Sequence, residues 1–231
     1  MFAGVDGCKG GWVVAMAPEW PPSPKLMLGI CRDFESVAAF TCKCSRIAVD
    51  MPIGLPEDSS DRVCDKKARD KLVGAKSRVF PCPPRQAVQE DNYDDFRRTH
   101  RRVAIKSGSR QAFEISPKIR ELDRWITPDT QDRVREFHPE LVWLRYAGKA
   151  PISKHGSEGV NQRVEILSTL GFRRIEELKV WKAAVGAAVK LDDLLDALVG
   201  LELASRIPHR AATVPRNPPT DPRGLRMEMW Y

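Results

Sequence analysis

The sequence predicts an α/β protein in which a β-hairpin comes first and helices alternate with further strands afterwards. Two apolar runs, 2–5 and 12–16, flank a glycine-containing turn, which is typical of paired strands. A later apolar run, 46–50, again ends at an aspartate and precedes a proline. A leucine stripe with helical spacing lies at 191–201. We therefore expect a sheet whose strands end in carboxylates, with a late helix packed against it.

The hairpin is the segment around which the rest of the chain is expected to organise. Residues 2–5 are continuously apolar, as in a strand covered on both faces at the centre of a sheet. The strand ends at Asp6, and Gly7 beside it lets another group approach the backbone closely. Asp and Gly also dominate turns, so Asp6 taken alone fits a turn as well as an active site.

Three further elements follow the hairpin. Residues 25–30 predict a third strand, and 34–40 have the apolar spacing of a short helix. The next strand, 46–50, is expected to stop at about Asp50 because Pro52 cannot donate a ladder hydrogen bond. Functional groups gather at the carboxyl ends of parallel strands. A second aspartate in this position therefore weakens the interpretation of these carboxylates as ordinary turn residues.

The region from 59 to about 130 predicts a mainly helical insertion. The pair Ser60–Asp61 is a candidate helix cap, and Ser116 followed by Pro117 predicts the N-cap and first position of another helix. The densest charge run, 97–102, fits a solvated helix face or a phosphate-contacting patch.

The last third of the chain contains a short predicted strand, 134–138, several helices and the helix at 191–201. Asp193 and Asp196 are three residues apart and share one helix face. Capping and the helix dipole account for Asp193, but Asp196 lies about a turn further in among apolar neighbours, where a carboxylate needs a partner. The small residues Ala197 and Gly200 would let this helix lie close to the sheet.

Composition describes an ordinary globular chain. Its 231 residues are 30% charged and 42% hydrophobic, and the formal charge of +7 favours contact with a polyanion without identifying one. The N-terminal residues lack the pattern of a secretory signal, and the longest small-apolar stretch, 183–189, is far shorter than the roughly 20 residues that span a bilayer. Because no cysteine pair has CxxC spacing, we expect reduced thiols and a cytoplasmic protein that makes no membrane contact.

Taken together, these features resemble the ribonuclease H-like fold. Within it, the chain resembles the RuvC/YqgF-like side and the DUF429 group, predicted RNase H-like nucleases. The resemblance covers most of residues 1–205 and is carried by the segments 4–12, 47–55, 77–81, 136–140 and 193–197. It implies a mixed sheet flanked by helices, with the first three strands antiparallel and the later strands parallel. The expected organisation is a single domain at 1–207, the helical insertion at about 59–130 and a Pro/Arg-rich tail at 208–231.

The resemblance implies metal-dependent hydrolysis of phosphodiester bonds. Carboxylates are hard oxygen ligands suited to Mg²⁺ or Mn²⁺, and crowded carboxylates raise one another's pKa unless a cation neutralises them. Two ions about 4 Å apart would activate a water and stabilise the leaving oxygen. In this hypothesis Asp6 lies between the ions, and Asp50 and Asp196 each complete the shell of one ion. Asp193 serves as a further ligand or as a base beside the ions, and Glu136 is a reserve ligand.

The implied partner is a nucleic acid, although nothing in the sequence distinguishes RNA from DNA or indicates an oligomeric state. Basic residues that would hold its phosphates are Arg78, Arg85, Lys118, Lys154 and Arg163. His138 is expected to be structural rather than catalytic.

Two other functions remain open. A catalytically inactive RNase H-like module would bind nucleic acid or a nucleotide with the same fold and charge. An ATP-dependent phosphotransferase of the sugar-kinase or actin-like type would share the core. That class requires a second Gly-rich phosphate loop and a duplicated domain, whereas this sequence has no internal repeat and no Walker-type loop.

Overall fold

The computed structural model describes residues 1–22, 25–58, 61–104, 107–154, 156–207 and 209–231. The chain divides into two compact units. The first unit consists of Met1–Asp50, Arg133–Ala212 and Trp230–Tyr231, and the second consists of Met51–Asp132 and Thr213–Met229.

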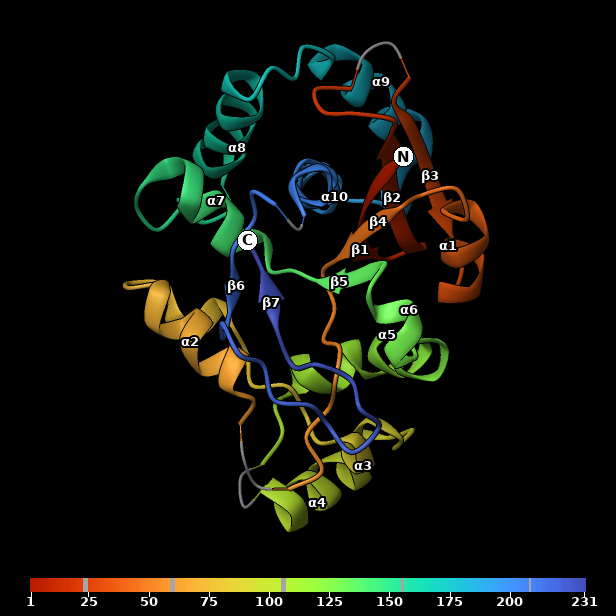
Figure 1. Cartoon of the computed structure of the whole chain (residues 1–231), viewed down its shortest axis with the longest axis vertical. Helices are drawn as coiled ribbons and strands as arrows, with labels where there is room; N and C mark the ends of the chain where they lie inside the picture. Colours follow the sequence, from red (N-terminus) through yellow and green to blue (C-terminus); the bar gives the residue numbers. More distant parts are fainter. Residues whose placement is uncertain (23–24, 59–60, 105–106, 155, 208) are drawn as a thin grey trace. The chain divides into compact units, whose positions relative to one another are not determined.

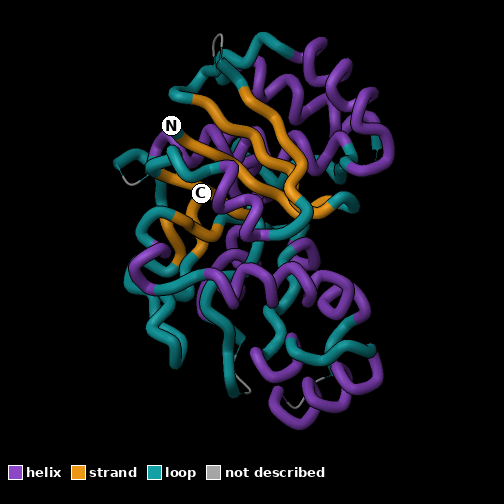
Figure 2. The backbone as a smooth tube through the Cα atoms, turned by 90° about the vertical axis from the view of Figure 1, so that its right-hand side faces the viewer, coloured by secondary structure: helices purple, strands orange, loops and turns teal. Residues whose placement is uncertain are grey.

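The first unit is built on a five-stranded mixed sheet of order β3-β2-β1-β4-β5 (Figure 1). Figure 2 shows its strands side by side. β2 pairs antiparallel with β1 and with β3, whereas β4 pairs parallel with β1 and with β5. This is the arrangement expected of an RNase H-like fold, and the predicted change from antiparallel to parallel pairing is confirmed. The strands are β1 (Phe2–Cys8), β2 (Gly11–Ala17), β3 (Met27–Cys31), β4 (Arg46–Val49) and β5 (Val134–Glu136).

Different helices cover the two faces of this sheet. Gly4 of β1 pairs with Ala15 of β2 and with Ala48 of β4, so these three residues share one face. That face packs against α10 (Leu191–Arg206). Trp12 belongs to the opposite face and meets Phe34 of α1 (Phe34–Phe40) with ring centroids 5.3 Å apart. The continuous apolar runs of the hairpin therefore reflect burial on both faces.

Helix α10 lies between the sheet and the pair α7 (Pro139–Ala147) and α8 (Ser157–Thr169) (Figure 1). An added Cβ on Gly4 would lie 2.0 Å from the carbonyl oxygen of Ala197. An added Cβ on Gly200 would lie 2.7 Å from Cζ of Phe137. The close approach predicted from the small residues of this helix is confirmed, and it buries the helix along most of its length.

The remaining elements of the first unit follow local signals. α7 begins with Pro139 at its first position and ends at Gly148, whose φ of +69° is in the left-handed region. α8 is followed by Gly171, with a φ of +92°. The predicted helix over 175–189 is α9 (Ile175–Val185) followed by a 3₁₀ turn, Gly186–Ala188.

The second unit is mainly helical, as predicted for the insertion. In the described residues it contains α2 (Val63–Lys71), the 3₁₀ helix η1 (Lys76–Arg78), α3 (Arg85–Val88), α4 (Tyr93–Ala104), α5 (Arg110–Trp125) and α6 (Pro128–Gln131). Strands β6 (Thr213–Val214) and β7 (Met229–Trp230) form a two-stranded sheet. The N-cap of α2 is Arg62, and Ser60, one of the predicted caps, lies outside the described residues.

The predicted start of a helix at Ser116 was wrong. α5 begins earlier, with Ser109 as its N-cap accepting a hydrogen bond from the Ala112 N–H at 3.1 Å. Pro117 lies inside the helix, and the Ser116 hydroxyl donates to the carbonyl of Ala112 at 2.7 Å. Buried residues occur on both sides of the proline, so packing of one helix face offsets the hydrogen bond that proline removes.

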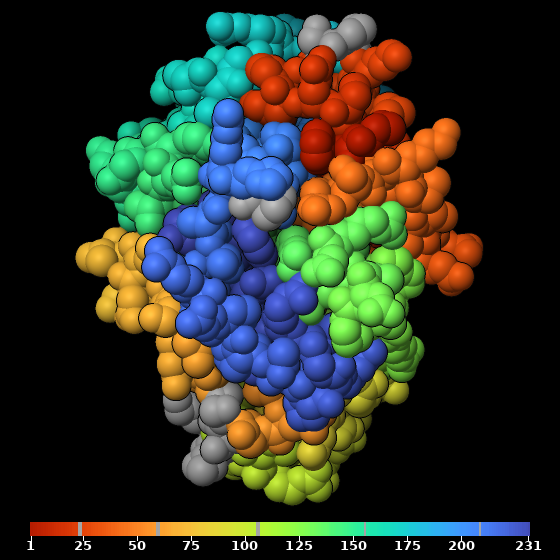
Figure 3. Space-filling view, in the orientation of Figure 1, coloured from red at the N-terminus to blue at the C-terminus, as the bar shows by residue number. Residues whose placement is uncertain are grey.

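The segment from 208 onward was expected to be a tail, but residues Thr213–Met229 form part of the second unit. Figure 3 shows this segment in dark blue on the surface of the molecule. Its Asp221 is buried and accepts hydrogen bonds from the backbone N–H groups of Leu55, at 3.1 Å, and Leu225, at 2.9 Å. One carboxylate thus ties the segment to residues far away in the sequence, which its irregular composition did not reveal. No helix in the described part of the chain is long and apolar enough to cross a membrane.

Candidate active site

The ends of two adjacent parallel strands bring Asp6 and Asp50 together. Val5 of β1 pairs with Val49 of β4, and the Asp50 N–H continues the ladder by donating to the Val5 carbonyl at 2.9 Å. Gly4 and Ala48 lie on the face that packs on α10. Asp6 and Asp50 each come two residues later in their strands, so their side chains belong to the same face. Asp6 is buried and Asp50 is half-buried. The predicted convergence of these two carboxylates is present.

Asp196 comes to the same face from α10 and is completely buried. Its Oδ1 accepts a hydrogen bond from Nε1 of Trp143 at 2.8 Å, and its Oδ2 accepts one from Nζ of Lys154 at 2.8 Å. A buried carboxylate inside a helix requires hydrogen-bond partners, and for Asp196 these are the indole of Trp143 and the ammonium group of Lys154.

Asp193 lies in the first turn of α10 and completes a capping box there. Its carboxylate accepts a hydrogen bond from the Lys190 N–H at 3.0 Å, and it is half-buried. Asp192, which the sequence did not single out, has its Oδ2 3.7 Å from Nζ of Lys154. We refer to Asp6, Asp50, Asp193 and Asp196 as the acidic cluster.

Burial and mutual repulsion set the protonation of this cluster. Burial, followed by the charges of Asp50 and Asp196, raises the pKa of Asp6 well above its ordinary value. Burial and the charge of Asp196 likewise raise the pKa of Asp50. Lys154 works in the other direction at both carboxyl groups. Burial lowers the pKa of Lys154 itself, but the charges of Asp196, Asp6 and Asp50 outweigh it and raise that pKa overall, so the lysine remains an ammonium ion.

The donor chemistry of the cluster suits a hard cation, but its members are not equally available. All of the donors are carboxylate oxygens, which Mg²⁺ and Mn²⁺ prefer. Within the described residues, no three of these carboxylates place ligand oxygens within 4.8 Å of one another. Both oxygens of Asp196 already accept hydrogen bonds, whereas the bond recorded for Asp6 in the described part of the chain comes from its neighbour Gly7, at 2.7 Å. Asp6 and Asp50 therefore fit a metal ion best.

Glu136, the predicted reserve ligand, lies in β5 on the other face of the sheet. It pairs with Val49, whose side chain faces away from α10, whereas Asp6 and Asp50 face α10. Its charge still contributes to the raised pKa of Asp50. The structure therefore places Glu136 near the cluster but not on its face.

Two of the predicted phosphate contacts have other surroundings in the first unit. Arg163 is completely buried, and it donates to Oε1 of Glu140 at 2.6 Å and to the carbonyls of Ile152 and Gly159, both at 3.0 Å. It supports the loop that carries Lys154 and does not present its charge at the surface. Lys154 is paired inside the acidic cluster.

The other three predicted phosphate contacts belong to the second unit. Arg78 lies in η1 and Lys118 lies in α5, and both are half-buried. Arg85 pairs with Asp123 at 3.1 Å, with Asp221 at 2.5 Å and with Glu57 at 2.7 Å. Arg85 is thus engaged by carboxylates of its own unit.

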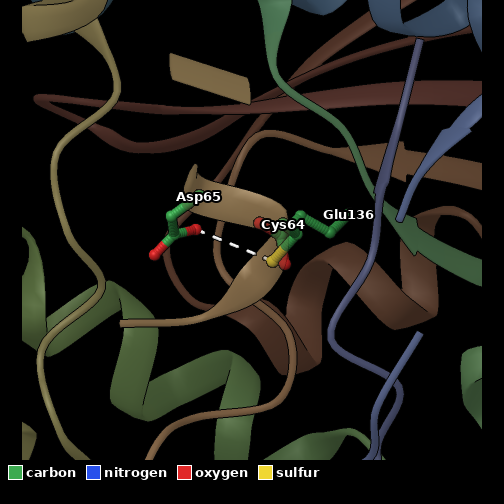
Figure 4. Close-up of side chains that lie close together, drawn as sticks. All are labelled: Cys64, Asp65 and Glu136. Carbon is green, nitrogen blue, oxygen red and sulfur yellow. Dashed lines mark hydrogen bonds between the residues drawn. The ribbon is translucent and has the colours of Figure 1, made fainter. Parts of the chain in front are cut away.

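The second unit also contains a buried carboxylate that the sequence analysis did not single out. Asp65 accepts hydrogen bonds from Nη2 of Arg62 at 2.7 Å and from the Cys82 N–H at 3.0 Å. The thiol of Cys64 donates to its Oδ1 across 3.7 Å (Figure 4). Arginine, backbone and thiol donors together satisfy this carboxylate, which indicates a structural role.

Exposed arginines gather on α4 in the second unit. A shallow surface hollow is lined by Asp94 and by Arg97, Arg98, Arg101 and Arg102. This is the charge run that fitted either a solvated face or a phosphate-contacting patch.

Two residues of the site could not be found from the sequence. Trp143 resembles any buried aromatic of an amphipathic helix, and Glu140 resembles an acidic residue in a first helical turn. His138 is the N-cap of α7, with Nδ1 accepting from the Glu140 N–H at 3.3 Å. The structural role predicted for this histidine agrees with that contact.

Comparison with known proteins identifies a family but no characterised relative. No curated protein and no solved structure matches the chain. A family model described as "Protein of unknown function (DUF429)" matches residues 4–220. That match includes both strand-end aspartates, α10 and nearly all of the second unit. The chain therefore belongs to the DUF429 family.

Proposed function

We propose that the chain is a divalent-metal-dependent nuclease that hydrolyses phosphodiester bonds of nucleic acid at the acidic cluster, with Mg²⁺ or Mn²⁺ as cofactor. One observation carries the proposal. Asp6 and Asp50 end adjacent parallel strands on one face of the sheet, where burial and neighbouring carboxylates raise the pKa of both.

The excess negative charge of the cluster favours the binding of a cation. Among the described residues, Lys154 acts on all four carboxylates, and Lys190 acts on Asp193 as well, so the negative charges outnumber the positive ones. Buried like charges destabilise the folded chain unless they are protonated or a cation neutralises them. A buried cluster that costs stability is typical of a functional site. Because its ligands are carboxylate oxygens, the function that fits it is metal binding.

The chemistry follows from what each side chain is able to do. A bound Mg²⁺ or Mn²⁺ would supply an activated water and neutralise charge on the phosphate group. Asp6 and Asp50 would hold the ion. Asp193, a half-buried carboxylate of the same cluster, would take the proton of the attacking water as the new P–O bond forms and the bond to the leaving oxygen breaks, and solvent would protonate the leaving oxygen.

Nucleic acid is the proposed substrate because the chain is basic and carries a concentrated arginine surface. The formal charge is +7, and four arginines of α4 line one shallow hollow. Such a surface attracts a phosphate backbone without reading its sequence. We place the activity in the cytoplasm, where cysteines stay reduced, because the six cysteines are thiols that form no disulfide.

The proposal is tested by incubating labelled single-stranded and duplex RNA and DNA with the protein in Mn²⁺, in Mg²⁺ and in EDTA. We expect cleavage in metal only, and a loss of roughly 100-fold or more in Asp6→Asn and Asp50→Asn. Asp70→Asn is the matched control, since Asp70 is an exposed aspartate of α2. Circular dichroism establishes that each variant is folded. Full activity in folded Asp6→Asn would refute the proposal.

The same assays separate the two alternatives. Mn²⁺ binding and nucleic-acid binding without turnover would indicate a catalytically inactive binding module. ATP hydrolysis in the absence of nucleic acid would indicate a phosphotransferase.

A further inference from the structure

The ammonium group of Lys154 lies among the carboxylates of the acidic cluster and its neighbour Asp192. Its Nζ lies 2.8 Å from Oδ2 of Asp196 and 3.7 Å from Oδ2 of Asp192. The charges of Asp6 and Asp50 also act on it. One ammonium group therefore serves carboxylates from α10 and from the ends of β1 and β4.

Side chains of α8 hold the segment that precedes Lys154. Before the lysine, the Ile152 N–H donates to Oε1 of Gln162 at 2.8 Å, and the Ile152 carbonyl accepts from Arg163 at 3.0 Å. After the lysine, the Gly159 carbonyl accepts from the same guanidinium at 3.0 Å. Arg163 is itself completely buried and paired with Glu140. The fold thus supports the backbone from which Lys154 reaches the cluster.

Asp196 is arranged to hold this lysine rather than a second divalent ion. Trp143 takes one of its oxygens and Lys154 takes the other. The indole N–H fixes the orientation of the carboxylate, so Oδ2 is presented to the ammonium. A divalent ion at Asp196 would meet an ammonium only 2.8 Å from its own ligand oxygen, and the two positive charges would repel each other.

We infer that Lys154 is a resident cation that replaces one of the two metal ions, so that the acidic cluster binds a single divalent ion through Asp6 and Asp50. This inference deepens the proposed function and rests on it. Lys154 then acts as a positioning residue: it neutralises Asp196 and leaves the strand-end carboxylates for the metal.

The experiment is a calorimetric titration of the purified full chain with Mn²⁺, in the absence of nucleic acid. We expect the wild type to bind one ion. Lys154→Gln should bind a second ion, or bind the first at least about tenfold more tightly, because a repelling charge is gone and Asp196 is released. Lys154→Arg keeps the charge and should behave like the wild type. Lys149→Gln is the matched control, because it removes an exposed lysine from the same loop.

Each outcome bears on the inference. Wild-type binding of two ions or of none overturns it, and so does Lys154→Gln binding that is unchanged or weaker. A lysine that only stabilises the fold would lower the melting temperature on removal without adding metal affinity. If Lys154→Gln is unfolded without metal, recovery of its circular dichroism spectrum in Mn²⁺ supports the inference, and failure to recover overturns it.

Nuclease assays on the same proteins keep the two proposals distinguishable. One bound ion with this dependence on Lys154, but no cleavage of any substrate, retains the inference and removes the proposed function. Metal-dependent cleavage by a wild type that binds two ions does the reverse.

Discussion

The buried carboxylates of the second unit and those of the acidic cluster in the first unit have different partners. In the second unit, Asp65 lies 2.7 Å from a guanidinium nitrogen of Arg62, and Arg85 pairs with Asp123 and Asp221. In the first unit, Lys154 pairs with Asp196 of the acidic cluster, and its charge acts on Asp6 and Asp50 as well. Arginines meet these buried acids of the second unit, as Arg163 meets Glu140 in the first unit, whereas the acidic cluster keeps an excess of negative charge.

The difference separates charges that hold a fold together from charges that are kept for chemistry. A bidentate arginine satisfies a carboxylate through several directed hydrogen bonds, so the pair needs nothing from solvent. The carboxylates of the acidic cluster lack enough positive partners to balance their charge. The pKa values of Asp6 and Asp50 are raised for that reason, together with burial. A local conflict of this kind is typical of functional sites, whereas the rest of a natural sequence is mutually consistent.

Breaking the second unit's pair should give the largest effect on stability. Asp65→Ala removes the carboxylate that accepts from two nitrogens of the buried Arg62, and it also leaves the Cys82 N–H without that acceptor. We expect the free energy of unfolding in urea to fall by about 3 kcal/mol or more. Asp70→Asn, an exposed change in the same helix, should stay within about 0.5 kcal/mol of the wild type. A loss at Asp65 as small as that of the control would contradict the structural role.

The strand ends and their aspartates were predictable, because apolar runs that stop at an aspartate and a breaker are local signals. Asp6 and Asp50 follow from such signals, the close packing of α10 follows from its small residues, and membership of the DUF429 family was predicted from a resemblance carried by several short segments. The partners of Asp196 were not predictable, because Trp143 and Lys154 lie 53 and 42 residues away in sequence. No short pattern records a contact of that range.

The surroundings of other predicted site residues were hidden from the sequence for equally physical reasons. Glu136 lies one residue from a position that would face α10, and a shift of one residue in a strand exchanges the faces. Arg163 and Arg85 resembled phosphate contacts because the identity of a basic residue does not reveal whether it is buried among carboxylates. The sequence therefore specifies which residues end the strands better than it specifies which charges meet.

The arginines exposed on α4 extend the comparison to the surface, because they are positive charges that the second unit leaves in contact with solvent. Arg101→Gln combined with Arg102→Gln should weaken binding of a nucleic-acid duplex roughly tenfold at low salt and reduce the slope of log affinity against log salt by about 2. Fluorescence anisotropy over a salt series measures both quantities. Arg32→Gln combined with Lys149→Gln makes the same change in net charge at exposed positions of the first unit. Equal losses of affinity in the two double variants would show that the α4 arginines contribute only through the net charge of the protein.

Asp6→Asn tests the deficit of the acidic cluster directly, and its expected effect on stability is the smallest. In the metal-free protein the variant should be more stable than the wild type at neutral pH by about 1 kcal/mol, because the amide removes one repelling charge. Urea unfolding in EDTA measures this difference. Saturating Mn²⁺ should then stabilise the wild type and not the variant, which reverses their order. A variant that is less stable than the wild type without metal would show that Asp6 is already compensated.

The sign of the pH dependence follows from the direction of the pKa shift. Burial and the charges of Asp50 and Asp196 raise the pKa of Asp6, so at pH values between its unfolded and folded pKa the folded chain holds a proton that the unfolded chain has released. The stability of the metal-free wild type should therefore fall as pH rises from about 4 through the folded pKa. Asp6→Asn lacks this contribution, so its advantage should disappear near pH 4 and grow toward neutral pH. A difference between the two proteins that stays constant from pH 4 to pH 8 would mean that the cluster is not short of positive charge, and the contrast between the two units would then lose its functional meaning.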